Sequence, residues 1–114
     1  MIKQNHPLLD AFADQRTRTV HTLANALRAD PRIAAAWLFG SLARREEDAL
    51  SDIDIWVVVR DEDAKQVIEN RRRFVTTLGN PIHIQDAPHN APANGGYLLT
   101  LYPTPLGVQH IDWY

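Results

Sequence analysis

The sequence predicts an α/β (α+β) fold, in which helices pack on a mixed β-sheet of about five strands. Two long segments carry apolar residues at helical spacing, short apolar runs stand between and after them, and a turn bounded by Pro103 and Gly107 separates the last two runs. No internal repeat or low-complexity tract is visible. We expect one domain over residues 1–114. Because the chain stops at Tyr114, in or just after a predicted strand, we also expect it to be the N-terminal part of a longer natural protein.

A long amphipathic helix and a strand are expected at the start of the fold. Residues 8–28 place apolar side chains such as Leu23 and Leu27 on one face, and the pattern ends before Pro31. Residues 33–39 (IAAAWLF) form a short apolar run, which is typical of a buried strand.

A short helix and a second strand are expected next. Ser41 can cap a helix that continues to Glu47, and residues 48–51 form a polar connection. Residues 52–60 return to an apolar pattern and predict the second strand.

The second half of the chain predicts one helix and three strands. Residues 62–78 have helical periodicity, and Gly79-Asn80 is a typical stop signal. The expected order after this helix is a strand at 81–86, a loop rich in Pro, Asn and Gly at 87–96, and strands at 97–102 and 108–113. We expect the last two strands to form an antiparallel hairpin.

Composition excludes several classes of function. The chain has no cysteine, so a metal must bind to Asp, Glu or His. A net charge of −2 lacks the basic excess of proteins that bind duplex nucleic acid non-specifically, so there is no strong nucleic-acid signal. No apolar run is long enough for a membrane-spanning helix and no secretory signal is visible, so we expect a cytoplasmic protein with no membrane partner.

The most informative residues are two acidic side chains on the second predicted strand. Side chains alternate across a strand, so Asp52 and Asp54 share one face while Ile53 and Ile55 share the other. Two neighbouring carboxylates repel each other unless a cation lies between them. Mg²⁺ prefers oxygen ligands and often shares them with substrate phosphates, so this pair indicates a magnesium site.

A Gly-Ser pair at the end of the first predicted strand supplies the second half of the site. The missing side chain of Gly40 lets phosphate oxygens approach backbone N–H groups at a helix N-terminus, and Ser41 adds a hydroxyl donor. Ten residues separate this pair from Asp52. The combination predicts that a nucleoside triphosphate binds here.

These motifs resemble the DNA polymerase β-type nucleotidyltransferase superfamily, including its antibiotic nucleotidyltransferases and minimal nucleotidyltransferases. Phe39-Gly40-Ser41 and Asp52-Ile53-Asp54 match its signature. The resemblance implies a small nucleotidyltransferase fold over nearly all of residues 20–113 and a third carboxylate on a later strand. Asp112 is the best candidate, because it lies within an apolar strand whereas Asp86 stands at a strand end.

The resemblance also implies the reaction and the roles of the residues. Asp52 and Asp54 would bind two Mg²⁺ ions, with Mn²⁺ as the alternative, while Asp112 would bind the catalytic ion and help to deprotonate the acceptor. The enzyme would transfer a nucleoside monophosphate, AMP from ATP in the simplest case, to a hydroxyl of an unidentified acceptor. Arg44 is a candidate contact to the phosphates, and Arg45 departs from the glycine that the small members commonly have, which leaves the substrate subgroup open.

Other interpretations of these residues stay open at this stage. The chain is alternatively an antitoxin-like minimal nucleotidyltransferase that acts chiefly through a helical protein partner, or a relic that only binds nucleotide. We expect a C-terminal helical domain, a second copy of the chain in a homodimer, or a partner chain to complete the acceptor pocket. His110 shares a predicted strand face with Asp112 and is either structural or a ligand, and one of the three tryptophans is a candidate to stack on the base.

Overall fold

A computed structural model describes residues 7–39 and 52–114, and it contains the predicted mixture of helices and a mixed sheet. Gly40, Ser41 and Arg44 lie outside the described residues, as do the helix expected to end at Glu47 and the connection expected at 48–51. The elements are α1 (Pro7–Ala29), β1 (Ile33–Phe39), β2 (Ile53–Val59), α2 (Asp61–Glu69), α3 (Arg71–Thr77), β3 (His83–Gln85), the 3₁₀ turn η1 (Pro88–Asn90), β4 (Leu98–Thr104) and β5 (Gly107–Trp113).

The sheet has the strand order β1-β2-β5-β4-β3. β2 and β5 run parallel, and the other three neighbouring pairs are antiparallel. The predicted hairpin is confirmed as β4 and β5, which are joined through the pair Thr104 and Gly107. Gly107 has a φ of +136°, a conformation that favours glycine at this turn. The parallel pairing of β2 with β5 places the C-terminal strand at the centre of the sheet, between β2 and β4.

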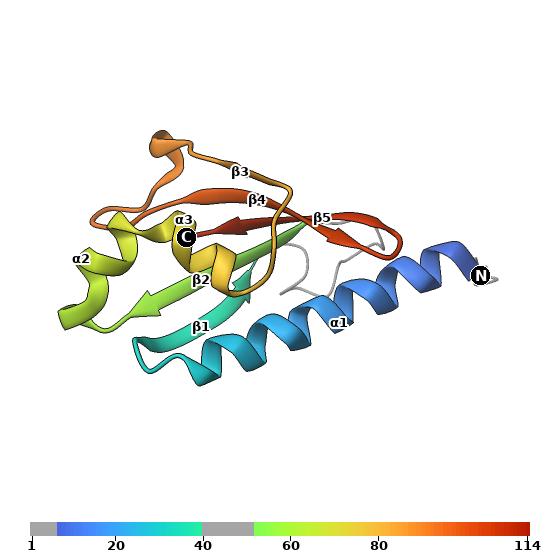
Figure 1. Cartoon of the computed structure of the whole chain (residues 1–114), viewed down its shortest axis with the longest axis horizontal. Helices are drawn as coiled ribbons and strands as arrows, with labels where there is room; N and C mark the ends of the chain where they lie inside the picture. Colours follow the sequence, from blue (N-terminus) through green and yellow to red (C-terminus); the bar gives the residue numbers. More distant parts are fainter. Residues whose placement is uncertain (1–6, 40–51) are drawn as a thin grey trace.

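The helices bury one face of the sheet. α1 runs beside β1 and continues toward the N-terminus, while α2 and α3 lie nearer the other end (Figure 1). The core consists of alternate side chains of the central strands together with apolar side chains of all three helices. Among its most buried members are Ile53, Ile55, Leu98, Ile111, Val75 and Leu23. Because alternate residues of β2 and β5 fill this core, Asp54 and Asp112 point to the opposite face.

Thr100 is a polar residue at the centre of this core and is fully buried. Its hydroxyl donates to Ile111 O at 2.9 Å and accepts a hydrogen bond from Trp113 Nε1 at 2.9 Å. We expect Thr100→Val, which keeps the shape but leaves Trp113 Nε1 unpaired, to lower the free energy of unfolding by about 1–3 kcal/mol. Urea unfolding measures this, with Thr22→Val at an exposed position of α1 as the control. Equal stability of wild type and Thr100→Val would contradict the role of this hydrogen bond.

The prediction of a single helix over residues 62–78 was wrong, because Asn70 separates two helices, α2 and α3. The backbone of Asn70 is non-helical (φ −109°, ψ 30°), and its side-chain Nδ2 donates to Gln66 O at 2.9 Å. An Asn side chain that bonds to nearby backbone competes with the helix and favours a break. The apolar period nevertheless continues across the break, so Val67 and Phe74 both reach the core.

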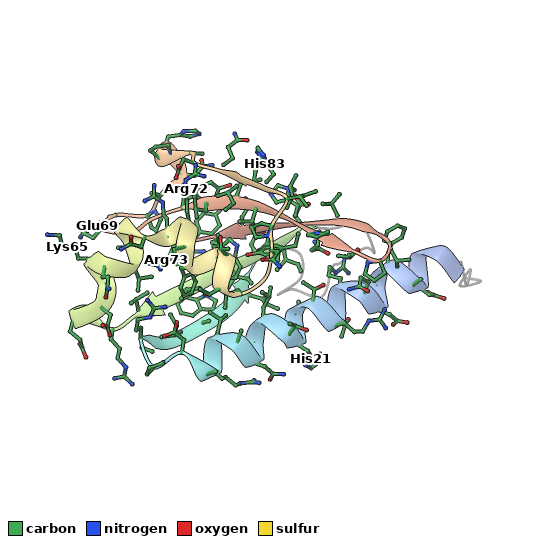
Figure 2. The ribbon with its side chains drawn as sticks, in the orientation of Figure 1. His21, Lys65, Glu69, Arg72, Arg73 and His83 are labelled. Atoms are coloured by element: carbon green, nitrogen blue, oxygen red, sulfur yellow. The ribbon has the colours of Figure 1, made fainter. Side chains whose placement is uncertain are left out.

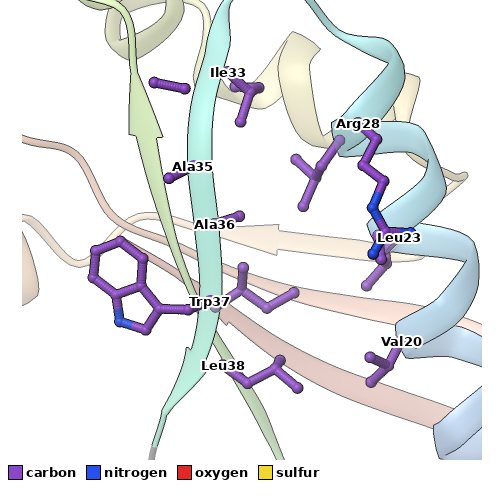
Figure 3. A pocket seen from close by; sticks show the side chains of 12 residues that line it. Val20, Leu23, Arg28, Ile33, Ala35, Ala36, Trp37 and Leu38 are labelled. Carbon is purple, nitrogen blue, oxygen red and sulfur yellow. The ribbon is translucent and has the colours of Figure 1, made fainter.

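An apolar groove of about 310 Å³ lies between α1 and β1 at the edge of the sheet. Val20 and Leu23 of α1 face Leu38 of β1 across it, whereas the indole of Trp37 points away from the helix (Figure 3). Trp37 is 49% exposed. The indole therefore belongs to the sheet face that also carries the acidic residues. Over the described ranges, no helix combines the length and the apolar character needed to cross a membrane.

Candidate active site

Strand pairing places two carboxylates side by side on the sheet face opposite the core. Asp54 of β2 is the register partner of Asp112 of β5, and their neighbours Ile53 and Ile111 are also partners but point into the core. Asp52 stands one residue before β2, and its side chain is 54% exposed, against 15% for the side chain of Asp112. The three acidic residues singled out from the sequence therefore meet where the two parallel strands begin their pairing.

His110 lies between two of these carboxylates. Its Nδ1 is 3.4 Å from Asp52 Oδ2, and its Nε2 is 3.1 Å from Asp112 Oδ1. Because residues i and i+2 share one face of a strand, the position of His110 on β5 puts its ring beside Asp112. The imidazole thus connects the exposed carboxylate to the more buried one.

Asp54 has an unusual protonation equilibrium. Burial of the carboxyl, its hydrogen bond with Asp112 and the negative charges of Asp112 and Asp52 raise the pKa of Asp54 to about 6, from an ordinary value of 3.8. These causes have the same physical origin, since a buried carboxylate beside other carboxylates is costly to ionise. The cost would fall if a cation bound between them. The electrostatic environment of Asp54 therefore favours the binding of a cation beside it.

Two tyrosines border the carboxylates. Tyr97 Oη donates a hydrogen bond of 2.5 Å to Asp112 Oδ1, and burial together with this bond raises the pKa of Tyr97. Burial raises the pKa of Tyr114 as well, with a further contribution from the charges of Asp112 and Asp54. Both phenols are therefore held neutral at physiological pH, and Tyr97 fixes one oxygen of Asp112.

An aromatic row crosses the same sheet face beside the acidic residues. The rings of Trp37 and Trp56 are nearly parallel, with centroids 6.2 Å apart, and those of Trp56 and Tyr114 are nearly parallel at 5.5 Å. Tyr97 completes the row at 5.1 Å from Tyr114, tilted by 58°. Since Trp56 and Tyr114 each follow an acidic residue by two positions, the row and the carboxylates share one face.

Asp86, the less favoured candidate for the third carboxylate, is engaged elsewhere. Arg71 Nη2 donates to its Oδ1 at 2.7 Å and Arg72 Nη2 to its Oδ2 at 2.8 Å, and these ion pairs lower the pKa of Asp86. Arg72 lies with His83 on one side of the molecule, whereas His21 lies on the other, on α1 (Figure 2). Among the described residues, the group that could hold a metal ion consists of Asp52, His110 and Asp112, and it includes neither Asp86 nor these two histidines.

The donor set fits a hard divalent cation. One ligand atom from each of Asp52, His110 and Asp112 lies within 4.8 Å of the others. Carboxylate oxygens suit Mg²⁺, and an imidazole nitrogen among them also suits Mn²⁺. The raised pKa of Asp54 supplies a second argument, because a cation would offset the repulsion that raises it.

The structure thus unites three of the predicted site residues and adds three that the sequence did not assign. Asp52, Asp54 and Asp112 converge. His110 was named only as an alternative, and its signal was the i, i+2 spacing to Asp112. Tyr97 and Tyr114 carried no signal, because their proximity to the carboxylates depends on the fold.

Comparison with known protein families identifies one that matches much of the chain. Residues 21–94 match the family described as Polymerase beta, Nucleotidyltransferase, a match that covers well over half of the chain and includes Asp52 and Asp54. No curated protein matches the chain significantly.

Proposed function

Since the chain belongs to the polymerase β nucleotidyltransferase family, we propose that it transfers a nucleoside monophosphate from a triphosphate to a hydroxyl acceptor. ATP is the proposed donor and AMP the transferred group. The observation that carries the proposal is the pairing of Asp54 with Asp112 on the open sheet face, with Asp52 and His110 beside them. The proposed location is the cytoplasm, where nucleoside triphosphates are abundant.

The proposed reaction is an in-line displacement at the α-phosphate. The acceptor oxygen forms a bond to the α-phosphorus, the bond from this phosphorus to the bridging oxygen breaks, and pyrophosphate leaves. Asp112 accepts the proton of the acceptor hydroxyl, and Tyr97 keeps its carboxylate oriented by donating to Oδ1. Gly40, Ser41 and Arg44 are the proposed contacts to the phosphates.

Asp52, Asp54 and Asp112 are the proposed ligands of Mg²⁺, or of Mn²⁺. When bound, the ions would neutralise phosphate charge and stabilise the attacking and leaving oxygens. The part played by the protein is to hold the carboxylates at fixed positions on two hydrogen-bonded strands, so that little reorganisation is needed during the reaction.

A second candidate is the antitoxin-like role, in which the domain acts through a helical protein partner or a second copy of itself. The observation that favours it is the exposure of Trp37 and Val58, which are 49% and 41% accessible on the strands beside the site. An apolar partner face would cover both side chains.

Binding of ATP with Mg²⁺, measured by isothermal titration, tests the proposed function. We expect saturable binding that EDTA removes and that the double variant Asp52→Asn/Asp54→Asn loses by at least about tenfold, because the carboxylates are needed to hold the ion that bridges protein and phosphate. The matched control is Asp10→Asn/Asp14→Asn, an exposed acidic pair one turn apart on α1. Binding that both double variants retain equally would refute the proposed site and leave the partner-dependent role as the leading candidate.

A further inference from the structure

His110 places a nitrogen donor among the acidic side chains of the site. Its side chain is 29% exposed and stands on β5 two positions before Asp112, so both residues point to the sheet face opposite the core. One ligand atom from each of Asp52, His110 and Asp112 lies within 4.8 Å of the others. Asp54 is not a member of this group and is hydrogen-bonded to Asp112. The group with suitable geometry therefore contains two carboxylates and one imidazole.

The distance between His110 and Asp112 suits two ligands of one metal ion. An octahedral ion that holds its ligands at about 2.1 Å places neighbouring ligand atoms about 3.0 Å apart. His110 Nε2 is 3.1 Å from Asp112 Oδ1, which is close to that separation. An ion can therefore bind both side chains with little movement of either one.

The second ring nitrogen of His110 also faces a suitable partner. A histidine that binds a metal through one nitrogen usually donates a hydrogen bond from the other, often to a carboxylate. His110 Nδ1 is 3.4 Å from Asp52 Oδ2, slightly further than in an ordinary hydrogen bond. The side chain of Asp52 is 54% exposed, so a small rotation would complete the bond and leave Asp52 Oδ1 available to the ion.

A nitrogen ligand changes which ions a site prefers. Mg²⁺ prefers oxygen ligands, whereas imidazole favours first-row transition metals, whose affinities rise from Mn²⁺ through Co²⁺ to Ni²⁺. The contribution of an imidazole to affinity is therefore larger for Co²⁺ than for Mg²⁺. The loss of such a ligand changes the ratio of the two affinities, which the loss of a residue that only positions the carboxylates does not.

We propose that His110 binds the metal ion together with Asp52 and Asp112, and that its imidazole makes the site select first-row transition-metal ions over Mg²⁺. The inference rests on the proposed function for the presence of a metal ion at this site. It adds a ligand of a different chemical class to the proposed carboxylates. The role assigned to His110 is selection of the metal, while Asp112 still accepts the proton of the acceptor hydroxyl.

Titration of Co²⁺ and of Mg²⁺ into the full chain at pH 7.5, without nucleotide, tests the selectivity. We expect wild type to bind Co²⁺ at least about tenfold more tightly than Mg²⁺. His110→Asn should weaken Co²⁺ binding by at least about tenfold and Mg²⁺ binding by no more than about threefold. His110→Asp, in which all three ligands are oxygen, should lose the preference for Co²⁺ but still bind Mg²⁺. Retained Mg²⁺ binding shows that the site of this variant is intact.

Pulsed electron paramagnetic resonance of bound Mn²⁺ tests the ligation directly. We expect a nitrogen hyperfine coupling in wild type and its loss in His110→Asn. The matched control is His83→Asn, which removes an imidazole on β3 that does not belong to the metal-binding group. This control should keep both the coupling and the selectivity of wild type.

A nitrogen coupling that is absent from wild type, or that persists in His110→Asn, overturns the proposal. Equal losses of Co²⁺ and Mg²⁺ affinity in His110→Asn also overturn it, because His110 then only positions the carboxylates. Failure of the proposed function gives a different result, since these measurements need neither nucleotide nor acceptor. In that case the nitrogen-ligated ion is still observed, but no nucleotidyl transfer to any hydroxyl is detected.

Discussion

We expect Asp112→Asn to lower the rate of nucleotidyl transfer by at least about 10³-fold, a loss on the scale seen when one charge-stabilising group is removed from a phosphoryl-transfer site. The amide cannot take the proton of the acceptor hydroxyl and is a weaker ligand for a cation. Its oxygen can still accept the hydrogen bond from Tyr97, so the local structure should persist. Triphosphate binding should be largely retained, because Asp52 and Asp54 remain. A turnover assay that follows pyrophosphate release measures the effect.

The matched control for this variant is Asp86→Asn. It removes a carboxylate from the same protein, but one that is held by Arg71 and Arg72 on the other side of β4. These pairs are partly exposed, so their loss should cost no more than about 1 kcal/mol of stability and leave turnover unchanged. Unchanged turnover in Asp112→Asn would remove Asp112 from the mechanism. A large loss of turnover in Asp86→Asn would instead assign the role of third carboxylate to Asp86, which its position at a predicted strand end had disfavoured.

The strands and helices of the fold were largely predictable because their signals are local. The first strand was predicted at its observed bounds, Ile33–Phe39, and the alternation of Ile53 and Ile55 with the acidic residues gave the correct faces of β2. The break at Asn70 was not predicted, since the apolar period runs through it and only a side-chain hydrogen bond to Gln66 marks the interruption. Strand β3 is only three residues long, shorter than the alternating run suggested, because it pairs with β4 over His83 to Gln85 alone.

The site was predictable in part. Asp52 and Asp54 follow from strand alternation, and Asp112 followed from its apolar surroundings and from the resemblance to a family. Its position directly beside Asp54 depends on β2 and β5 pairing in parallel across two helices and two strands, which no local pattern specifies. The contact of Tyr97 with Asp112 likewise joins residues 15 positions apart through the β4–β5 hairpin. Contacts between residues so far apart in the sequence can be identified only once the fold is known.

In the metal-free wild-type protein, we expect the contribution of Asp54 to the free energy of unfolding to fall as the pH rises. The pKa of this group is about 6 in the folded protein and 3.8 ordinarily, so between these values the folded state binds more protons than the unfolded chain. The contribution of Asp54 to the free energy of unfolding is therefore highest below pH 3.8, falls through this window and stays low above pH 6. Because the group is partly exposed, we expect a change on the order of 1–2 kcal/mol. Asp54→Asn should exceed wild type in stability by this amount at pH 7.5 and match it near pH 4.

We expect Mg²⁺ to make the wild type more stable than Asp54→Asn at pH 7.5, which reverses the order expected without metal. At 100 times its dissociation constant a ligand specific for the folded state adds about 2.7 kcal/mol, and the gain should be larger at pH 7.5 than at pH 5, where protons compete for the carboxylates. Asp54→Asn should gain much less, because one ligand and its negative charge are lost. Urea unfolding of the wild type and of Asp54→Asn, at both pH values and with either EDTA or excess Mg²⁺, measures the free energy of unfolding under these four conditions. An equal Mg²⁺ effect at the two pH values, or one retained in Asp54→Asn, would mean that the ion binds away from this carboxylate pair and that the raised pKa of Asp54 serves some purpose other than metal capture.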